Sequence, residues 1–356
     1  MKKFLSLILV LGLSATLLAG CGGGSSAAAD SGNAGDTAAE GNDAGYNTLN
    51  IIAAHGSTET VAQHTSYVYL KELLEERSGG AITMDIYPNQ QLGGDREYTE
   101  ACVQGNVTMG APSPAAIAAL CPSLNAFETP FLFSDYETAR ATMDSDAGKA
   151  LLDSLEQYGL KGLGYYENGF RNLTCNKEIN SLADLKGLKI RTMENNVHLA
   201  IWQALGANPS PLAFGELYTA LQQGAFDAQE NPLEQIYNNK LHEVQDHVYL
   251  TQHIYTPYIV FMNLDVWNSL NEQTQQLIQE CMDESVQYNR ETCDTNNQAC
   301  IDGINNSGMS KVYEVSDDLR AEMIQACTDA GIYDTVIEAA GGTYAQDLWA
   351  AAGFEY

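Results

Sequence analysis

The chain has 356 residues, of which 45% are hydrophobic, and its 46 acidic and 17 basic residues give a formal net charge of −29 at pH 7. A surface this acidic repels phosphate groups, so the composition argues against binding to nucleic acid or to an anionic membrane surface. The length and the apolar content suffice for two packed lobes of roughly 150 residues each.

The first twenty residues have the build of a secretory signal. Lys2 and Lys3 precede an apolar run over residues 4–18, which is too short to span a bilayer stably. A Leu-Ala-Gly-Cys sequence then ends at Cys21. In bacterial lipoproteins the signal peptide is cut before the cysteine of such a sequence, and that cysteine is acylated. We predict a lipoprotein signal peptide over residues 1–20 and a lipid on Cys21, which would anchor an extracytoplasmic protein in the membrane at the cell surface or in the periplasm. An ordinary signal peptide with a chance cysteine is the alternative.

Residues 21–47 are predicted to form a flexible tether. They are mostly Gly, Ser, Ala, Asp and Asn, so they bury too little apolar surface to offset the entropy of ordering. Such a segment between a lipid and a fold holds the fold away from the membrane. No later apolar run approaches about 18 residues, so we expect no membrane-spanning helix in the rest of the chain.

The cysteines after Cys21 are not arranged as a redox or metal motif. They contain no CxxC pair, and their odd number cannot be fully bridged within one chain. We interpret most of them as small buried hydrophobic residues, with a disulfide between two of them as the open alternative. They are Cys102, Cys121, Cys175, Cys281, Cys293, Cys300 and Cys327.

From residue 48 onward the pattern alternates between strands and helices. A strand over 49–54, a helix over 61–77 and a strand over 81–87 form a β-α-β unit with parallel strands. The alternation continues with a helix over 98–104, a strand over 107–111, a helix over 139–158 and a strand over 161–166. A second β-rich start over 170–175 and 188–191, followed by a helix over 197–205, indicates a second α/β lobe.

Residues 265–302 contain no glycine or proline, and Asn271 with Glu272 makes a plausible helix start within them. A helix over most of this span is about 45 Å long or more. Because that exceeds one small lobe, we expect it to lie across both lobes.

The motifs of common enzyme classes are absent from the sequence or wrongly spaced. His242 and His247 resemble a zinc-protease motif, but five residues on a helix turn their side chains about 140° apart. There is no GxSxG motif and no Gly-rich phosphate loop followed by Lys-Ser/Thr. We therefore expect no enzyme activity, no metal and no cofactor, and we interpret both histidines as lying on a solvated helix.

Two arginines differ from the rest by their position at strand ends. Arg171 lies where one predicted strand begins and Arg191 where another ends, whereas most other arginines fall in predicted helices, where they typically pair with surface carboxylates. In open α/β sheets, ligands bind beyond the strand ends. A guanidinium can hold a carboxylate with two parallel hydrogen bonds. Arg171 and Arg191 are therefore candidates for binding a carboxylate.

Five separated stretches carry a resemblance to a known family. They are YPNQQLGGDRE at 87–97, IRTMEN at 190–195, ALGANP at 204–209, AFGELYTALQQG at 213–224 and FDAQENPL at 226–233. In this order they resemble the solute receptors of tripartite ATP-independent periplasmic (TRAP) transporters, the DctP-like family. The resemblance covers nearly the whole chain from about residue 48.

This resemblance implies a periplasmic-binding-protein-like α/β fold, with two lobes joined by a hinge and a long helix spanning both. We expect lobe I to comprise 48–168 and 257–296, and lobe II to comprise 169–256 and 297–356. The implied function is that of a monomeric extracytoplasmic receptor. It would bind a small organic acid, either a sugar acid or a C4-dicarboxylate, and deliver it to TRAP permease subunits in the membrane. An ABC-type substrate-binding lipoprotein, a sensory receptor and a secreted sugar-acid enzyme are the alternatives.

The resemblance also implies roles for individual residues. Arg191 matches the arginine that pairs with the ligand carboxylate, and Arg171 matches a second arginine that often supports it. Asn231 matches an asparagine that donates to the same carboxylate. Phe214 matches an aromatic residue that packs on the ligand. Ala228 departs from the family pattern, which commonly has glycine there.

The other half of the ligand is less well defined by the sequence. Asp95 and His55 fall on positions that contact the far end of the ligand in some members. Glu194 and Ser113 occupy positions that are polar but variable. Because Asp95 and Glu194 would accept hydroxyl protons, we expect a hydroxylated acid, such as a uronate or an aldonate, to be preferred over a bare dicarboxylate.

Overall fold

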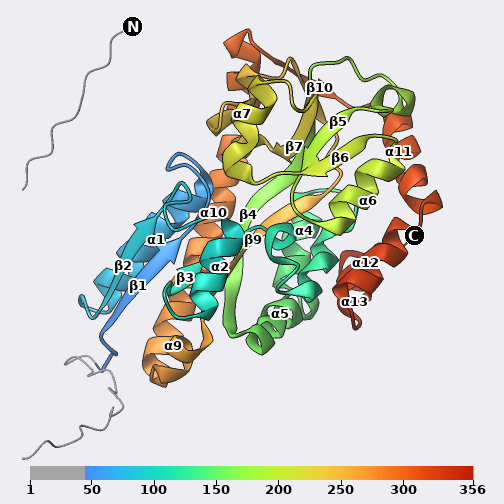
Figure 1. Cartoon of the computed structure of the whole chain (residues 1–356). Coiled ribbons are helices and arrows are strands. Elements are labelled where there is room, and N and C mark those ends of the chain that lie inside the picture. The colour runs from blue at the N-terminus through green and yellow to red at the C-terminus, as the bar shows by residue number, and fades with distance from the viewer. Residues whose placement is uncertain (1–44, 356) are drawn as a thin grey trace, which may run out of the picture. The chain divides into compact units, whose positions relative to one another are not determined.

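The computed structural model describes residues 45–355 of the chain (Figure 1). The predicted signal peptide, the predicted lipidation site Cys21 and most of the predicted tether lie outside the described residues. Gly45 and Asn47, at the end of the predicted tether, contact the start of a long helix. The backbone N–H of Asn47 donates to Thr274 Oγ1 at 2.9 Å, and Asn271 Nδ2 donates to the carbonyl of Gly45 at 2.9 Å.

The described strands form one mixed sheet in two groups. β1 pairs in parallel with β2 and β3, and β5 pairs in parallel with β6 and β7. The long strands β4 and β9 pair antiparallel with each other between these groups, in the order β2-β1-β3-β9-β4-β7-β5-β6, while β8 pairs with β4 and β10. This confirms the predicted α/β class with parallel β-α-β units. The strands are β1 (Leu49–Ala54), β2 (Ile82–Tyr87), β3 (Met109–Gly110), β4 (Leu160–Cys175), β5 (Lys189–Thr192), β6 (Asn208–Pro211), β7 (Ala228–Pro232), β8 (His247–Leu250), β9 (Tyr255–Asn263) and β10 (Lys311–Glu314).

Strand β4 joins two segments that the sequence pattern separated. The predicted strands over 161–166 and 170–175 are one strand of 16 residues. The apparent break is an irregularity in its pairing with β9 between Glu167 and Gly169, where Gly169 has φ of +104°. Glycine accepts this backbone conformation at low cost, so the strand bends at that point and continues. β4 therefore pairs with β9 along its first part and with β7 and β8 along its last part.

Helices cover the sheet, and several of them begin close to the residue at which the sequence predicted a helix. The predicted helix over 139–158 is instead divided, because Ser145 ends α4 and its side chain caps α5. The helix predicted from residue 98 begins at Asp95, directly after Gly94. The helices are α1 (Ala62–Arg77), α2 (Asp95–Val103), α3 (Pro114–Ile117), α4 (Tyr136–Asp144), α5 (Asp146–Asp153), α6 (Asn196–Ala204), α7 (Leu217–Gln222), α8 (Leu233–Asn238), α9 (Leu264–Ser269), α10 (Glu272–Ser307), α11 (Asp317–Asp329), α12 (Ile332–Ala340) and α13 (Tyr344–Ala352).

The long helix begins where the sequence predicted. Asn271 caps α10 by accepting a hydrogen bond from the backbone N–H of Thr274 at 2.8 Å. The 36 residues of α10 make it about 54 Å long. It packs on α1 and β4 and also on α8 and β10 (Figure 1). The helix thus contacts α1, which connects β1 to β2 of the first group, and α8, which follows β7 of the second group.

Buried side chains include all seven cysteines of the described chain, and all seven are free. This confirms their interpretation as buried hydrophobic residues. The interpretation of His242 and His247 was wrong, because His242 is buried in a short 3-10 helix over Leu241–Glu243 and His247 begins strand β8. Within residues 45–355, no helix combines the length and the apolar character that a membrane crossing needs.

Candidate ligand-binding site

A cavity of about 150 Å³ is lined by residues from β4, β5, β7, β9, α2 and α8 and from the segments between them. Six of the eight residues that the sequence marked as ligand contacts line it: Asp95, Ser113, Arg191, Glu194, Phe214 and Asn231. Arg171 and His55 do not. The cavity therefore brings together residues from distant parts of the chain around Arg191.

Arg191 is a buried cation with a free donor. It lies on β5 between Ser210 of β6 and Gln229 of β7, and only 2% of it is exposed. Its Nε and Nη2 donate to the carbonyl of Leu212 at 2.8 and 2.6 Å. Its Nη1 is buried and has no hydrogen-bond partner among the described residues.

This environment is unfavourable for a charged guanidinium. Burial lowers the pKa of Arg191 to about 10, although the negative charge of Glu230 acts in the opposite direction. A buried donor without a partner costs on the order of 1–3 kcal/mol, and more when it is charged. An anion in the cavity would remove this cost by accepting from Nη1.

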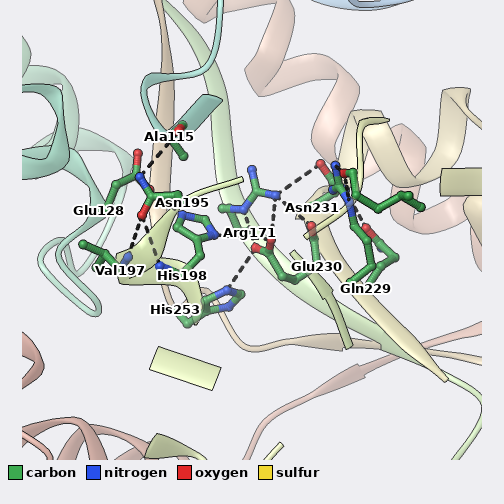
Figure 2. A network of polar contacts seen from close by, with 12 residues as sticks. Ala115, Glu128, Arg171, Asn195, Val197, His198, Gln229, Glu230, Asn231 and His253 are labelled. Carbon is green, nitrogen blue, oxygen red and sulfur yellow. Dashed lines mark hydrogen bonds and ion pairs between the residues drawn. The ribbon is translucent and has the colours of Figure 1, made fainter. Parts of the chain in front are cut away.

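Arg171 lies on β4 and is engaged by a buried carboxylate. Its Nε and Nη2 both donate to the Glu230 side chain, and Nη2 also donates to the carbonyl of Glu230 at 2.7 Å and to Asn231 Oδ1 at 3.3 Å (Figure 2). Its Nη1 makes no hydrogen bond to the described residues. Arg171 therefore supports Asn231 from behind, and Arg191 alone of the two arginines lines the cavity.

Asn231 and Phe214 flank Arg191 in the cavity. Asn231 lies on β7, donates to Gln229 Oε1 at 2.5 Å and accepts from Arg171, so its amide links the cavity to the Arg171–Glu230 pair. Phe214 begins a 3-10 turn over Phe214–Glu216. Its ring centroid lies 6.0 Å from the Arg191 guanidinium carbon, a distance at which the ring face attracts a cation.

The side of the cavity formed by α2 is acidic. Asp95 accepts from the backbone N–H of Ser113 at 2.9 Å and from the hydroxyl of Tyr98 at 3.0 Å. Burial raises the pKa of Asp95 to about 6 in spite of these two donors. Glu97 and Glu194 line the same cavity. Asp95 is the half-buried member of this acidic group, whereas Glu194 is exposed.

One basic side chain accompanies these carboxylates. Arg96 lines the cavity, but its Nε donates to Glu100 at 2.9 Å and its side chain is 60% exposed. An exposed pair of this kind contributes little binding energy. The acidic side of the cavity therefore offers hydrogen-bond acceptors and keeps a negative character.

His55 has a different environment from the one expected. Its side chain is fully buried, and its Nε2 lies 3.1 Å from His64 Nδ1. Its ring stacks on Tyr67 at 5.6 Å between centroids. Burial, followed by the neighbouring His64, lowers the pKa of His55 to about 3, so the imidazole is neutral at physiological pH. It lies beside the cavity-lining residue Gly56 without lining the cavity itself.

The sequence did not identify several polar residues in the cavity. Gln235 Nε2 donates to Ser57 Oγ at 3.0 Å and to Tyr258 OH at 2.8 Å, and these two hydroxyls lie 3.1 Å apart. Asn168, next to the bend in β4, has a buried Oδ1 without a hydrogen-bond partner in the described part of the chain. These four residues come from four separate segments, and no local motif marks them.

Gln90 brings the segment before α2 close to Phe214. Asn89 and Gln90 have φ values of 55° and 59°, a left-handed conformation that is uncommon for residues other than glycine. A Cβ atom on Gly215 would lie 2.9 Å from Gln90 Oε1. Gly215 therefore allows the two segments to approach at the edge of the cavity, which Gln90 and Phe214 both line.

The chain is similar to proteins of a known family. Residues 53–334 match the family DctP, described as bacterial extracellular solute-binding protein, family 7. The chain is 33% identical over 278 residues to the 2,3-diketo-L-gulonate-binding periplasmic protein YiaO of Escherichia coli, covering 76% of this chain and 85% of the relative. It is 34% identical over 272 residues to the C4-dicarboxylate-binding periplasmic protein DctP of Rhodobacter capsulatus, covering 76% and 81%.

Solved structures give the same result. The sugar acid binding protein DctPAm from Advenella mimigardefordensis, in complex with galactonate, superposes with a TM-score of 0.82 and 30% identity over 85% of this chain and 97% of that chain. A TRAP periplasmic solute-binding protein from Shewanella oneidensis with bound succinate gives a TM-score of 0.81 and 30% identity over 85% and 99%. The two-lobe fold is therefore shared with proteins that hold acids of different kinds.

Proposed function

Because this chain belongs to family 7 of the bacterial extracellular solute-binding proteins, the DctP family, we propose that it binds a small organic carboxylate at Arg191 and delivers it to TRAP permease subunits. The observation that carries this proposal is the free, buried Nη1 of Arg191 in the cavity. Members of the family are binding proteins of transport systems. We propose the same for this chain, without an enzymatic activity of its own.

The anchor for the carboxylate is built from donors that are already fixed. Arg191 is held by its two hydrogen bonds to the carbonyl of Leu212, so its Nη1 has a defined direction. Arg171 and Glu230 hold Asn231 in place behind the cavity. Fixed donors bind a ligand carboxylate without the entropic cost of ordering flexible side chains. Arg191 and Asn231 would contact the carboxylate, and Arg171 would support it.

The acidic side favours a ligand with hydroxyl groups. Asp95, Glu97 and Glu194 are acceptors, and a second carboxylate of the ligand would be repelled by them. Hydroxyl groups would instead donate to them, while Ser57, Gln235 and Asn168 offer further polar contacts. We therefore propose a hydroxylated monocarboxylate, such as an aldonate or a uronate, as the preferred ligand. The galactonate-bound relative supports this class, and the succinate-bound one keeps the C4-dicarboxylates as the alternative.

The remaining assignments follow the family. We propose lobe I as 48–168 with 257–296 and lobe II as 169–256 with 297–356, since the pairing of β4 with β9 is irregular between Glu167 and Gly169, opposite Pro257 and Thr256. Gln90 of lobe I already lies against Gly215 of lobe II, and ligand would shift the equilibrium toward such a closed form. We also propose a monomer anchored through lipid on Cys21, with residues 21–47 as the tether.

A thermal-shift screen tests the proposal with the purified mature domain. The panel contains D-galactonate, D-gluconate, D-galacturonate, D-glucuronate, succinate and fumarate, with the corresponding neutral sugars as controls. An acid at 100 times its dissociation constant stabilises the protein by about 2.7 kcal/mol, which raises the melting temperature by several degrees.

Calorimetry then gives the affinity of each acid that raises the melting temperature, and mass spectrometry shows whether it is recovered unchanged. We expect an aldonate or uronate to bind more tightly than succinate, and to be recovered intact. If no acid in the panel shifts the melting temperature, or if a neutral sugar shifts it equally, the carboxylate anchor is misplaced. Conversion of the bound acid would indicate an enzyme instead.

A further inference from the structure

A chain of buried charged side chains continues from the anchor into the protein interior (Figure 2). It leads from Arg171 on β4 through Glu230 on β7 to His198 on α6 and then to Glu128, at the end of a 3-10 helix over Pro122–Glu128. Their exposed fractions are 1% for Arg171 and Glu128 and 0% for Glu230 and His198. None of the cavity contacts described above requires His198 or Glu128.

His198 lies between two carboxylates. Its Nε2 is 2.5 Å from Glu128 Oε2, and its Nδ1 is 3.6 Å from Glu230 Oε1. A neutral imidazole has one nitrogen with a lone pair, which would be repelled by the carboxylate that it faces, whereas an imidazolium presents an N–H to each. Burial by itself lowers the pKa of His198, but the two carboxylates outweigh burial and raise it to about 8.

His253 also contacts Glu230 but has a different role. Its Nε2 lies 3.2 Å from Glu230 Oε2, and its Nδ1 lies 2.8 Å from the hydroxyl of Thr251. Burial lowers the pKa of His253, and this outweighs the attraction of Glu230. His253 is therefore a neutral donor, and the two carboxylates of the chain are balanced by Arg171 and protonated His198.

From this juxtaposition we propose that His198 and Glu128 are positioning residues for ligand binding. The protonated His198, held by Glu128, neutralises Glu230 so that the charge of Arg171 remains available to the ligand carboxylate. The inference rests on the proposed function. Loss of the proton would leave two buried carboxylates with Arg171 as their directly bonded cation and Arg191 as a more distant one, and would make the region next to the cavity more negative. The acid would then bind less tightly.

The backbone also connects His198 to the anchor. Helix α6 follows β5 after a short segment, which contains the cavity-lining residues Met193 and Glu194. Asn195 caps α6 by accepting from the backbone N–H groups of Val197 and His198 (Figure 2). Its Nδ2 donates to Asn125 Oδ1 at 2.9 Å. His198 therefore lies in the first turn of a helix that directly follows a cavity-lining segment, and Asn195 fixes the position of this turn.

The test is an NMR titration of the His198 imidazole in the wild-type protein, without ligand and saturated with D-galactonate, or with the tightest acid of the panel if galactonate does not bind. Affinity and protonation are reciprocally linked. We expect ligand to raise the pKa of His198 by about one pH unit, and the affinity to fall by about tenfold between pH 7 and pH 9.5. Asp95 stays ionised over this range because its pKa is about 6.

Two variants separate positioning from a general structural effect. His198→Gln removes the charge, so it should bind about tenfold more weakly at pH 7. Its affinity should change less than twofold between pH 7 and 9.5, a residual change that comes from Arg191, whose pKa is about 10. Glu128→Gln should lower the pKa of His198 and move the loss of affinity to lower pH. Melting temperatures serve as the control for folding. If His198→Gln does not fold, the NMR titration of the wild-type protein still tests the proposal.

The possible outcomes are distinguishable. If an acid binds and the pKa of His198 is the same with and without it, the positioning role is overturned while the proposed function stands. The role is also overturned if Glu128→Gln leaves the pKa unchanged. If no acid binds at any pH, the proposed function fails and the inference fails with it.

Discussion

The two sides of the cavity are built differently. On the side of β5 and β7, Arg191, Asn231 and the Arg171–Glu230 pair are buried, and their positions are fixed by hydrogen bonds to the backbone and to each other. On the side of α2, Glu194 and Arg96 are exposed, and Asp95 is half-buried. On the first side, Nη1 of Arg191 is a donor in the cavity without a partner among residues 45–355, whereas the second side has several acceptors with alternative partners.

This difference indicates how recognition is divided. The buried side suits a group that every ligand of the family would share, the carboxylate, because rigid donors reject ligands that lack it. The acidic side suits the variable remainder of the ligand, since half-exposed acceptors adapt at lower cost. Substitutions on the buried side should therefore affect all ligands strongly, and substitutions on the acidic side should change the preference among them.

The largest effect is expected from Arg191→Lys. Lysine keeps the charge but lacks the planar guanidinium group. That group donates hydrogen bonds to the carbonyl of Leu212 and at the same time directs Nη1 into the cavity. Calorimetry should show an affinity loss of about 2 kcal/mol or more for every acid of the panel, roughly 30-fold. Arg77→Lys is the matched control, because Arg77 pairs with Glu284 at an exposed position. Equal affinities in wild type and Arg191→Lys would mean that the buried side of the cavity does not bind the carboxylate more strongly than the acidic side.

The folded protein should also be stabilised by the proton on His198, next to the buried side of the cavity. The pKa of His198 is about 8 in the folded protein, against 6.5 for an unfolded histidine. A raised pKa contributes stability that is fully present below pH 6.5 and is lost as the pH rises through 8. The contribution is about 2 kcal/mol.

Urea unfolding at pH 6 and pH 9 measures this contribution as the difference between wild type and His198→Gln. We expect the wild type to lose about 2 kcal/mol more than the variant over this interval. Parallel losses in the two proteins would mean that His198 is not charged in the native state.

A smaller and selective effect is expected from Asp95→Asn. The amide keeps the shape but offers one acceptor and no charge, so a ligand hydroxyl loses a charge-assisted hydrogen bond. Affinity for galactonate should fall by about 1 kcal/mol, roughly fivefold, while affinity for succinate should stay level or rise. Equal losses for both acids would show that Asp95 does not distinguish them.

The smallest effect is expected from Arg96→Gln, on the same side. The Arg96 side chain is largely exposed and paired with Glu100, and exposed pairs of this kind contribute about 0–1 kcal/mol. Calorimetry should show at most a twofold change for either acid. A loss comparable to that of Arg191→Lys would reveal a second anion-binding residue on the acidic side.

The sequence predicted the elements whose periodicity is local. The strand over 49–54, the helix after Val61 and the Asn271 start of α10 agree with the structure within a residue or two. It failed where tertiary pairing decides the outcome. The stretch Glu-Asn-Gly before Phe170 is typical of a turn, yet pairing with β9 carries β4 through it with a bend at Gly169.

The same contrast applies to the site. Arg191 was found because an arginine at a strand end is unusual, and the family motif marked it as well. The neighbours of Arg171 were not predicted, because Glu230 is brought to it by the antiparallel pairing of β4 with β7. Ser57 meets Gln235 and Tyr258 through contacts of more than 170 residues in sequence separation, which no local pattern records.

A crystal structure of the complex with the tightest acid of the panel would show whether Arg191 holds the ligand. We expect a ligand carboxylate oxygen about 2.7–3.1 Å from Nη1 of Arg191, with Asn231 beside it and the hydroxyl groups directed toward Asp95. A carboxylate bound elsewhere, with Nη1 of Arg191 still without an acceptor, would contradict it.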